Sequence, residues 1–438
     1  MSEVPHSENG GPGASNAQTI IDTAKLEAAG KQLPPASQAL RNKFDFVGVD
    51  MRGTGYSQPI YCNPNLWNEL QWPLINDEAT YNATLAKARA WGQSCLNMTG
   101  PLVQYLGLDQ TVQDLDMVRR ALKQDKFHYQ GLSYGTSIGA YYAERYPDKV
   151  GRMVLDGVTH HSLSPEDEWL SNAVGVESTL EYFFRWCASS KECALHGQDA
   201  ARVFDTLYQR ADRGLLLSKG CLGNDVCYKN RQMRSWEFVL AILSHLHDGI
   251  TSGTYKPNST DSFQAVAQGL NVTFVENNSK YIPMLPVTVN SSSPAFTSFS
   301  EIAISCADRV ARHSSAGEFR NRNIVSRIYA PHSRGISFTQ QRATLCEAWP
   351  GKARNPPHTL DIKQTRKLPP IMLVNAVYDP STVLPWGLGM RASLPTAFSV
   401  YRNGPGHTSF GHQGHTAWAE AAFLVNGTIP ADGSVYKD

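Results

Sequence analysis

The sequence has no hydrophobic run long enough to cross a membrane and no block of a single charge sign. No apolar stretch reaches the roughly 20 residues that span a bilayer, and residues 1–13 are too polar for the apolar centre of a signal peptide. Forty Lys and Arg stand against 39 Asp and Glu, which leaves a formal net charge of +1 and no basic cluster to follow a phosphate backbone. We therefore expect neither a transmembrane segment nor a nucleic-acid partner.

Cys-x-x-Cys pairs and internal repeats are also absent. His196 is the only histidine between Cys187 and Cys227, which argues against a zinc site, and we expect no bound metal. The 438 residues are 41% hydrophobic, enough to bury a large core that divides into more than one packed unit.

Cysteines and glycosylation sequons point to an oxidising compartment. Eight cysteines fall in neighbouring pairs, which suggests disulfides, although eight cysteines allow about 105 connectivities and reduced thiols in a cytosolic protein are the alternative. The pairs are Cys62 and Cys95, Cys187 and Cys193, Cys221 and Cys227, and Cys306 and Cys346. The sequons begin at Asn82, Asn97, Asn258, Asn271, Asn277, Asn290 and Asn426. Together they predict a secreted protein or one of the secretory-pathway lumen, with a signal sequence absent from this chain.

Strand-like and helix-like stretches alternate as in an α/β protein. The expected strands are 44–50, 127–130, 152–155, 371–377 and 397–401, and the expected helices are 136–145, 174–186 and 417–425. Strand, helix and strand at the central spacing imply a parallel sheet. We expect two parts of one α/β core, residues 1–159 and 366–438, separated by a mainly helical cap over residues 160–365 that is rich in sequons and Ser/Thr/Asn stretches.

A candidate nucleophile lies between an expected strand and an expected helix. Gly131-Leu132-Ser133-Tyr134-Gly135 has the form G-x-S-x-G, in which a serine occupies a strained turn and a helix N-terminus behind it favours developing negative charge. A bare match to this motif is commonly coincidental, but the flanking pattern favours Ser133 as a catalytic nucleophile.

A serine nucleophile needs a histidine to take its proton and a carboxylate to orient that histidine. Asp379 follows the expected strand 371–377, and His407 follows the last expected strand, so both are placed at the carboxyl end of a parallel sheet. Asp156 is the alternative acid. His412 and His415 are competing histidines, and an Asp before proline is also common in plain turns.

The oxyanion formed during attack on a carbonyl needs two hydrogen-bond donors. The first is expected to be the backbone N–H of Tyr134, the residue after the nucleophile. Gly11, within Asn9-Gly10-Gly11-Pro12-Gly13, is our candidate for the second, although this stretch also reads as an unstructured terminus.

These motifs resemble the tripeptidyl and prolyl aminopeptidase group of α/β-hydrolases, whose C-terminal portion forms a characteristic module. The resemblance spans most of the chain and is carried by 50–57 (DMRGTGYS), 131–136 (GLSYGT) and 146–158 (YPDKVGRMVLDGV), with 9–13 similar to the oxyanion loop of that group. It implies an α/β-hydrolase fold under a helical cap, cleavage of peptide or arylamide bonds near a free N-terminus, and no metal or organic cofactor. Relatives carry two or three strands before the glycine loop, whereas here only residues 1–8 precede it, too polar for a central strand, so those strands are expected to be missing.

An aminopeptidase needs acidic groups in its cap to hold the ammonium of the substrate. Those available are Glu166, Asp167, Glu168, Glu177 and Glu181, with Glu166 and Glu168 preferred. Residues 164–168 (SPEDE) equally predict a helix start, because Ser caps, Pro suits the first position and acids complement the dipole.

Three functions remain open from the sequence. The first is an exopeptidase-like serine hydrolase acting on peptides. The second is an esterase or small-molecule hydrolase of a biosynthetic pathway, which uses the same acyl-enzyme chemistry. The third is a truncated, catalytically silent binding protein. Oligomeric state and residue preference are not encoded in any pattern found here.

Overall fold

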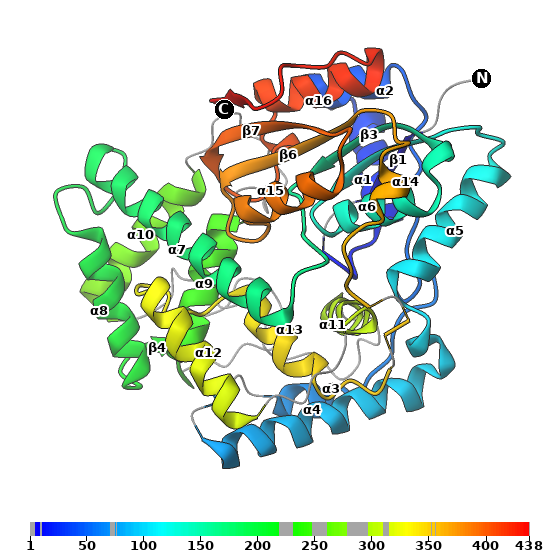
Figure 1. Cartoon of the computed structure of the whole chain (residues 1–438). Helices are drawn as coiled ribbons and strands as arrows, with labels where there is room; N and C mark the ends of the chain where they lie inside the picture. Colours follow the sequence, from blue (N-terminus) through cyan, green and yellow to red (C-terminus); the bar gives the residue numbers. More distant parts are fainter. Residues whose placement is uncertain are drawn as a thin grey trace.

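Strands from both ends of the chain meet in one parallel sheet (Figure 1). The computed structural model describes residues 5–8, 11–70, 75, 77–218, 231–247, 261–277, 297–309, 315–351, 353–354 and 356–437. Within them, six strands lie in the order β1-β2-β3-β6-β7-β8, and each pairs in parallel with its neighbours. Their bounds are β1 Pro5–Glu8, β2 Phe127–Leu132, β3 Val150–Asp156, β6 Ile371–Tyr378, β7 Phe398–Pro405 and β8 Ser434–Tyr436.

Both faces of this sheet are covered by helices, as its nearly continuous apolar strands require. Met153 and Leu155 of β3 pack on one face, whereas Val154 between them packs on the other. The Val154 face is covered by α2 (Pro35–Arg41) and α16 (His415–Asn426). The opposite face is covered by α5 (Leu108–Ala121), α6 (Tyr134–Arg145) and α15 (Leu384–Ser393).

Helices fill the sequence between β3 and β6 beside the carboxyl edge of the sheet (Figure 1). The earlier ones pack around a hydrophobic core of their own, whereas buried residues of the later ones, such as Phe299 and Ile302, belong to the core on the α5 and α6 face of the sheet. These helices are α7 Pro165–Ser189, α8 Ala200–Asp212, α9 Ser235–His247, α10 Asp261–Glu276, α11 Thr297–Ala307, α12 Ala316–Tyr329 and α13 Phe338–Cys346, with α14 Ile362–Thr365 leading back to the sheet. The two-residue strands β4 (Leu217–Ser218) and β5 (Arg231–Gln232) pair antiparallel in this region. Ser164 caps α7 by accepting from the Asp167 amide, which confirms the predicted helix start.

Helices that precede the nucleophile strand also contact this region. The remaining helices are α1 Asn16–Ala28, α3 Pro64–Glu69 and α4 Glu78–Thr99, with short 3-10 turns at Pro101–Gln104, Pro147–Lys149 and Phe410–His412. Tyr81 of α4 packs on Phe319 of α12 and donates a hydrogen bond to Glu347 at 2.8 Å. The long helix α4 thus closes the cap from the side opposite the sheet.

Three of the neighbouring cysteine pairs form disulfides: Cys62–Cys95, Cys187–Cys193 and Cys306–Cys346. Cys221 and Cys227 lie outside the described residues, as do the sequons at Asn258 and Asn290. Asn82, Asn97, Asn277 and Asn426 are exposed and Asn271 is half-buried, and glycosylation there stays a prediction.

One expectation about strands is wrong, and another is made more specific. Residues 5–8 do form a strand, β1, which pairs with β2 from Pro5 opposite His128 to Glu8 opposite Gly131 and leads into the glycine loop. Among the described strands it is at the sheet edge, where a proline without an N–H is tolerated. Residues 44–50, by contrast, are not assigned as a strand: Val47 forms only an isolated bridge, and the Val49 carbonyl accepts from the Asn16 side chain.

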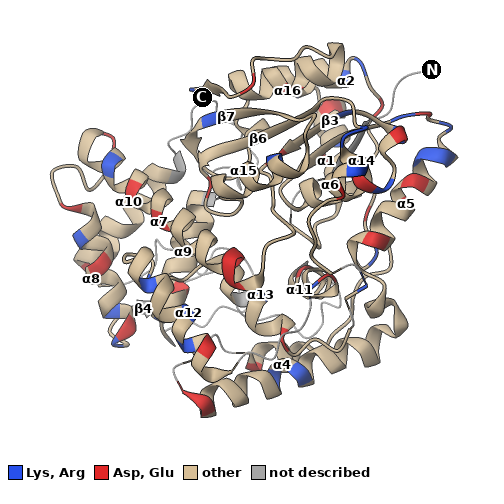
Figure 2. Cartoon of the chain, viewed as in Figure 1, with Lys and Arg blue, Asp and Glu red and all other residues tan. Residues whose placement is uncertain are grey.

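Charged side chains of both signs are interspersed along the outer helices (Figure 2). The sequence of β6, Ile-Met-Leu-Val-Asn-Ala-Val-Tyr, has none, and its first six residues are buried. Among the described helices, none is long and apolar enough to cross a membrane.

Candidate active site

Ser133 lies in a strained turn at the carboxyl end of β2. Its backbone has φ 55° and ψ −119°, a region that non-glycine residues rarely adopt, and α6 begins at the next residue. The turn is so tight that a Cβ on Gly131 would lie only 2.6 Å from the Gly135 carbonyl oxygen, which explains the glycine at this position. Hydrogen bonds from the amide and hydroxyl of Thr136 to the Ser133 carbonyl, at 2.9 and 2.6 Å, hold the turn. The sequence motif therefore has the strand–turn–helix geometry of a nucleophile elbow.

His407 and Asp379 are hydrogen-bonded to each other beyond the ends of β7 and β6. Nδ1 of His407 is 2.9 Å from Oδ2 and 3.0 Å from Oδ1 of Asp379. The Asp379 side chain is fully buried, whereas that of His407 keeps 11% exposure. A buried carboxylate on Nδ1 fixes the tautomer that leaves Nε2 to accept a proton.

Four further donors hold the Asp379 carboxylate in its ionised form. Oδ1 accepts from the amides of Ser381 and Thr382 at 2.8 and 2.9 Å, while Oδ2 accepts from the Thr382 hydroxyl at 2.7 Å and the Thr408 amide at 3.2 Å. Burial acts to raise the pKa of Asp379, but the charge and hydrogen bond of His407, together with Thr382, outweigh it and lower that pKa to about 2. The sequence analysis missed Thr382, although its place three residues after Asp379 is typical of an Asp-centred turn.

The competing candidates occupy other positions. His412 is in the 3-10 turn after the β7 loop, and His415 begins α16 with its ring stacked on Tyr436; neither lines the cavity described below. Asp156 ends β3, and its carboxylate accepts from the amides of Ser409 and Phe410, whereas Nδ1 of His407 lies within hydrogen-bond distance of Asp379 and Thr382. The described geometry therefore favours Asp379 over Asp156 as the partner of the histidine.

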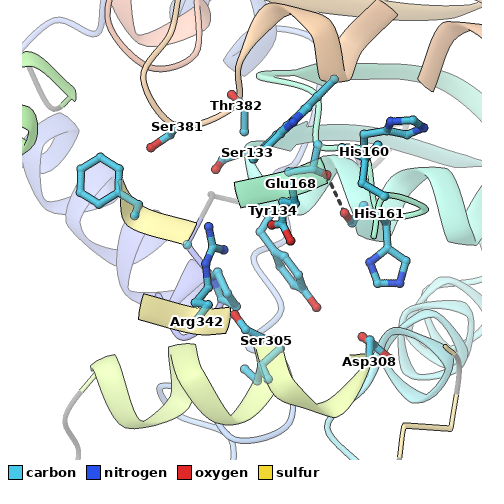
Figure 3. A pocket seen from close by; sticks show the side chains of 18 of the residues that line it. Ser133, Tyr134, His160, His161, Glu168, Ser305, Asp308, Arg342, Ser381 and Thr382 are labelled. Carbon is cyan, nitrogen blue, oxygen red and sulfur yellow. Dashed lines mark hydrogen bonds between the residues drawn. The ribbon is translucent and has the colours of Figure 1, made fainter. Parts of the chain in front are cut away.

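A cavity of about 740 Å³ joins these groups. Ser133, His407 and Thr382 line it from the sheet, and α7, α11 and α13 close it from the cap. Figure 3 shows Ser133 and Thr382 on one side of this space, facing Arg342 and Ser305 on the other. Apolar side chains, among them Ile304, complete the wall. A chamber of this size suits a ligand of a few residues.

The candidate oxyanion donors also border this cavity. Tyr134 and Gly11 both line it, and the amide of Tyr134 begins α6, where unpaired N–H groups gather. Gly11 has φ 81°, and its carbonyl accepts from the Ala14 amide at 3.0 Å. Residues 11–14 therefore form a turn just before the N-terminus of α1. Asn9 and Gly10 lie outside the described residues.

The cap acids named from the sequence have other partners. Glu166 pairs with Arg322 and does not line the cavity. Glu177 accepts from the amides of His332 and Ser333. The Asp167 amide donates to Ser164 at the N-terminus of α7, and Glu181 is exposed beside Arg185.

Glu168 is the one of these acids that lines the cavity, but it forms an ion pair with Arg309.

Two charged residues of the cap wall were not anticipated. Glu301 of α11 and Arg342 of α13 both line the cavity, and neither makes a hydrogen bond or an ion pair within the part of the chain that the structure describes. Burial raises the pKa of Glu301, and the positive charge of Arg342 opposes that shift only in part. Glu301 and Arg342 belong to no sequence motif. They are recognised as cavity residues only because the packing of α11 against α13 places both on the cavity wall.

His160 and His161 were also missed and line the same space. Burial, together with the charge of the nearby Arg309, lowers the pKa of His161 to about 3, so this imidazole is neutral. Among the described residues, no group of three or more His, Cys, Asp or Glu is arranged to hold a metal ion.

With this geometry in place, comparison with known proteins defines the class. The chain belongs to the α/β-hydrolase family, since residues 9–238 match the family described as alpha/beta hydrolase fold. Within that class it carries the module expected from the sequence, because residues 334–436 match the family described as TAP-like protein.

Several curated relatives are similar to most of the chain or to its first half. Serine protease Hip1 of Mycobacterium tuberculosis is 26% identical over 97% of this chain and 79% of its own length. Carboxylesterase B of the same species is 26% identical over 96% of this chain and 77% of its own length. Tripeptidyl aminopeptidase of Streptomyces lividans is 32% identical, but over 45% of this chain and 36% of its own length. A solved hydrolase from Pseudomonas aeruginosa PA01 covers 97% of this chain and 90% of its own, at 12% identity and a TM-score of 0.38.

Proposed function

We propose that this α/β-hydrolase is a serine hydrolase that cleaves short peptides near a free N-terminus through an acyl-enzyme. The observation that carries the proposal is the hydrogen bond of buried Asp379 to His407, whose imidazole lines the same cavity as the strained elbow of Ser133. Relatives named serine protease and tripeptidyl aminopeptidase support the peptide substrate. The three disulfides support an oxidising compartment as the place of action.

The proposed first half-reaction forms an ester bond. The Ser133 hydroxyl oxygen attacks the carbonyl carbon while Nε2 of His407 takes its proton, and the negative oxygen of the tetrahedral intermediate accepts from the amides of Tyr134 and Gly11. Asp379 stabilises the resulting imidazolium through Nδ1. His407 then gives the proton to the leaving amine as the carbon–nitrogen bond breaks, which leaves an acyl group on Ser133.

The second half-reaction restores the enzyme. A water molecule attacks the ester carbon while His407 takes one of its protons, and the same oxyanion donors act again. Collapse of the intermediate breaks the bond to Ser133, whose oxygen recovers the proton from His407. Burial of the chamber under the cap favours both steps because charge–dipole interactions are stronger where water is excluded.

Recognition of a free N-terminus is assigned to Glu301. It is a cavity-lining carboxylate of the cap that makes no hydrogen bond or ion pair with the described residues, so an ammonium of the substrate would satisfy it. Glu168, by comparison, is already neutralised by Arg309. This assignment moves the ammonium site from the start of α7, where the sequence placed it, to α11.

Esterase activity is the second candidate, because a relative named carboxylesterase is similar to nearly the whole chain. Purified protein should be incubated with a fluorophosphonate probe, then profiled against tripeptidyl arylamides, N-acetylated versions of the same arylamides, and aryl esters. Ser133-dependent labelling with preferred turnover of free-amino arylamides is expected. Ester turnover without arylamide turnover would replace peptidase by esterase, and absence of labelling would favour a silent binding protein.

A further inference from the structure

The loop that carries His407 is held by two buried charged residues that take no part in the proposed proton transfers. Arg402, on β7, is only 1% exposed. Its guanidinium donates to the carbonyl of Pro405 through Nη1 and to those of Gly406 and Thr408 through Nη2, each at 2.9 Å. One side chain thus fixes the backbone on both sides of the histidine.

Asp156 holds the other end of the same loop. It is completely buried at the end of β3, and its Oδ2 accepts from the amides of Ser409 at 2.7 Å and Phe410 at 2.8 Å. Strand β6 lies between β3 and β7, and Asp379 directly follows β6. The loop therefore passes over Asp379 on its way from β7 to Asp156. The two anchors therefore stretch the loop over the catalytic carboxylate.

The loop needs such anchors because its conformation is strained. Thr408, a β-branched residue, has φ 58°, in the left-handed region that such residues rarely adopt. Its amide donates to Asp379 and its carbonyl accepts from Arg402. Gly157, next to Asp156, packs beneath the ring, since a Cβ there would lie 3.0 Å from Thr408 Cγ2 and 3.5 Å from His407 Cε1. Unanchored, the loop would relax to a conformation that moves the imidazole.

Asp156 is an unusual residue to retain for packing alone. Its Oδ1 has no hydrogen-bond partner, although it is buried. Burial raises the pKa of Asp156 to about 6, against the opposing effects of the two amides and of the Arg402 and His407 charges. Burying a carboxylate costs free energy that an apolar residue of similar size would not. A role in holding the loop that carries His407 would explain why a carboxylate occupies this buried position.

We propose that Asp156 and Arg402 are positioning residues that clamp residues 405–410 and thereby keep His407 on Asp379 and over Ser133. The inference rests on the proposed hydrolase function. It predicts that loosening either anchor lowers the rate of acyl transfer while substrate affinity is retained, because neither residue lines the cavity.

The test compares Asp156→Ala, Asp156→Asn, Arg402→Met and Arg402→Lys with the unmodified chain. For each, the rate constant of fluorophosphonate labelling, kcat and KM for an arylamide, and the unfolding temperature are measured. Asp156→Ala and Arg402→Met should lower the labelling rate and kcat about 10- to 100-fold with KM within about twofold. Asp156→Asn keeps an oxygen for both amides and should stay within about threefold of the unmodified rate.

Arg119→Met is the matched control. Arg119 is a similarly buried guanidinium that pairs with Asp116 and donates to the carbonyls of Gln124 and Asp125, in a loop away from the cavity. It should lose stability without losing labelling rate. Should Arg402→Met fail to fold, Arg402→Lys, which reaches fewer of the three carbonyls, is expected to give an intermediate rate loss.

Each outcome separates the clamp from the proposed function. If the unmodified chain is not labelled at Ser133, the hydrolase function itself fails. If it is labelled, and folded Asp156→Ala and Arg402 variants match its rate, the clamp is overturned. Equal slowing by Arg119→Met, or equal slowing by Asp156→Asn and Asp156→Ala, would also overturn it, because general destabilisation or charge alone would then explain the effect.

Discussion

The edge of the sheet and the wall of the cap meet at one cavity but differ in how their charges are satisfied. At the sheet edge, Asp379 accepts from His407 and from donors of Ser381, Thr382 and Thr408. On the cap wall, Glu301 and Arg342 have no hydrogen bond or ion pair among the described residues. The hydrogen bonds of Asp379 are complete before any substrate binds, which suits a group that must orient His407 in every turnover. Glu301 and Arg342 lack such bonds, which suits residues that bind a charged group of the substrate.

Ser133→Ala removes the proposed nucleophile and should have the largest effect. We expect kcat to fall by a factor on the order of 10⁵–10⁶, with the unfolding temperature unchanged, because the turn is held by Thr136 and not by the hydroxyl. Turnover of an arylamide and thermal unfolding measure the two quantities. Activity close to that of the unmodified chain would refute the assignment.

Asp379→Asn breaks the preorganised network while preserving its shape. An amide nitrogen facing Nδ1 would force the tautomer in which Nε2 carries the proton, so kcat should fall by about 10⁴ with little change in KM. Steady-state kinetics measure the loss. A drop below tenfold would show that another acid orients His407, and Asp156 would then be the residue to examine.

Glu301→Gln tests the cap wall and should act on KM instead. Loss of a buried charge-assisted contact is worth about 10- to 100-fold in KM for free-amino arylamides, but should leave N-acetylated arylamides and esters unaffected. Glu181→Gln is the matched control, because Glu181 is an exposed cap acid paired with Arg185. Equal losses for free and acetylated substrates would argue against ammonium recognition.

The same contrast explains what could be predicted from the sequence. Strands β2, β3, β6 and β7 were found because buried parallel strands have continuous apolar sequences, and residues that follow such strands collect at one sheet edge. Ser133, Asp379 and His407 were named on that basis. Residues 44–50 have the same apolar character, but Val47 forms only an isolated bridge and the Asn16 side chain takes the Val49 carbonyl, a contact that no local pattern reveals.

The cap wall could not be predicted in the same way. Glu301 and Arg342 reach the cavity through the packing of α11 against α13, helices that a disulfide between Cys306 and Cys346 also joins. Acids at the start of α7 attracted attention because they form a conspicuous cluster, yet they serve the helix and its neighbours. Arg402 was overlooked because an arginine within a buried strand has no meaning until its three carbonyl partners are seen.

The smallest effect concerns the dependence of stability on pH, where carboxyl groups with a raised pKa and one with a lowered pKa act in opposite directions. Burial raises the pKa of Asp308, on the cap side, to about 7 despite the Leu108 amide that it accepts from, and raises that of Asp156 to about 6. Since both lie above the ordinary value of 3.8, the folded state binds more protons between about pH 4 and 7, and their stabilising contribution is lost as pH rises through those values. Asp379, lowered to about 2, contributes stability above 3.8 that is lost as pH falls through 2.

The unfolding temperature should therefore rise by a few °C, on the order expected for one or two kcal/mol, when pH falls from 8 to about 5, and should drop again below about pH 4. Asp308→Asn should flatten the rise between pH 8 and 6, whereas Asp22→Asn, at an exposed position of α1, should leave the slope unchanged. Scanning calorimetry across this range measures both. A stability that instead increases steadily from pH 5 to 8 would mean that burial does not raise the pKa of Asp308 and Asp156 in the folded protein.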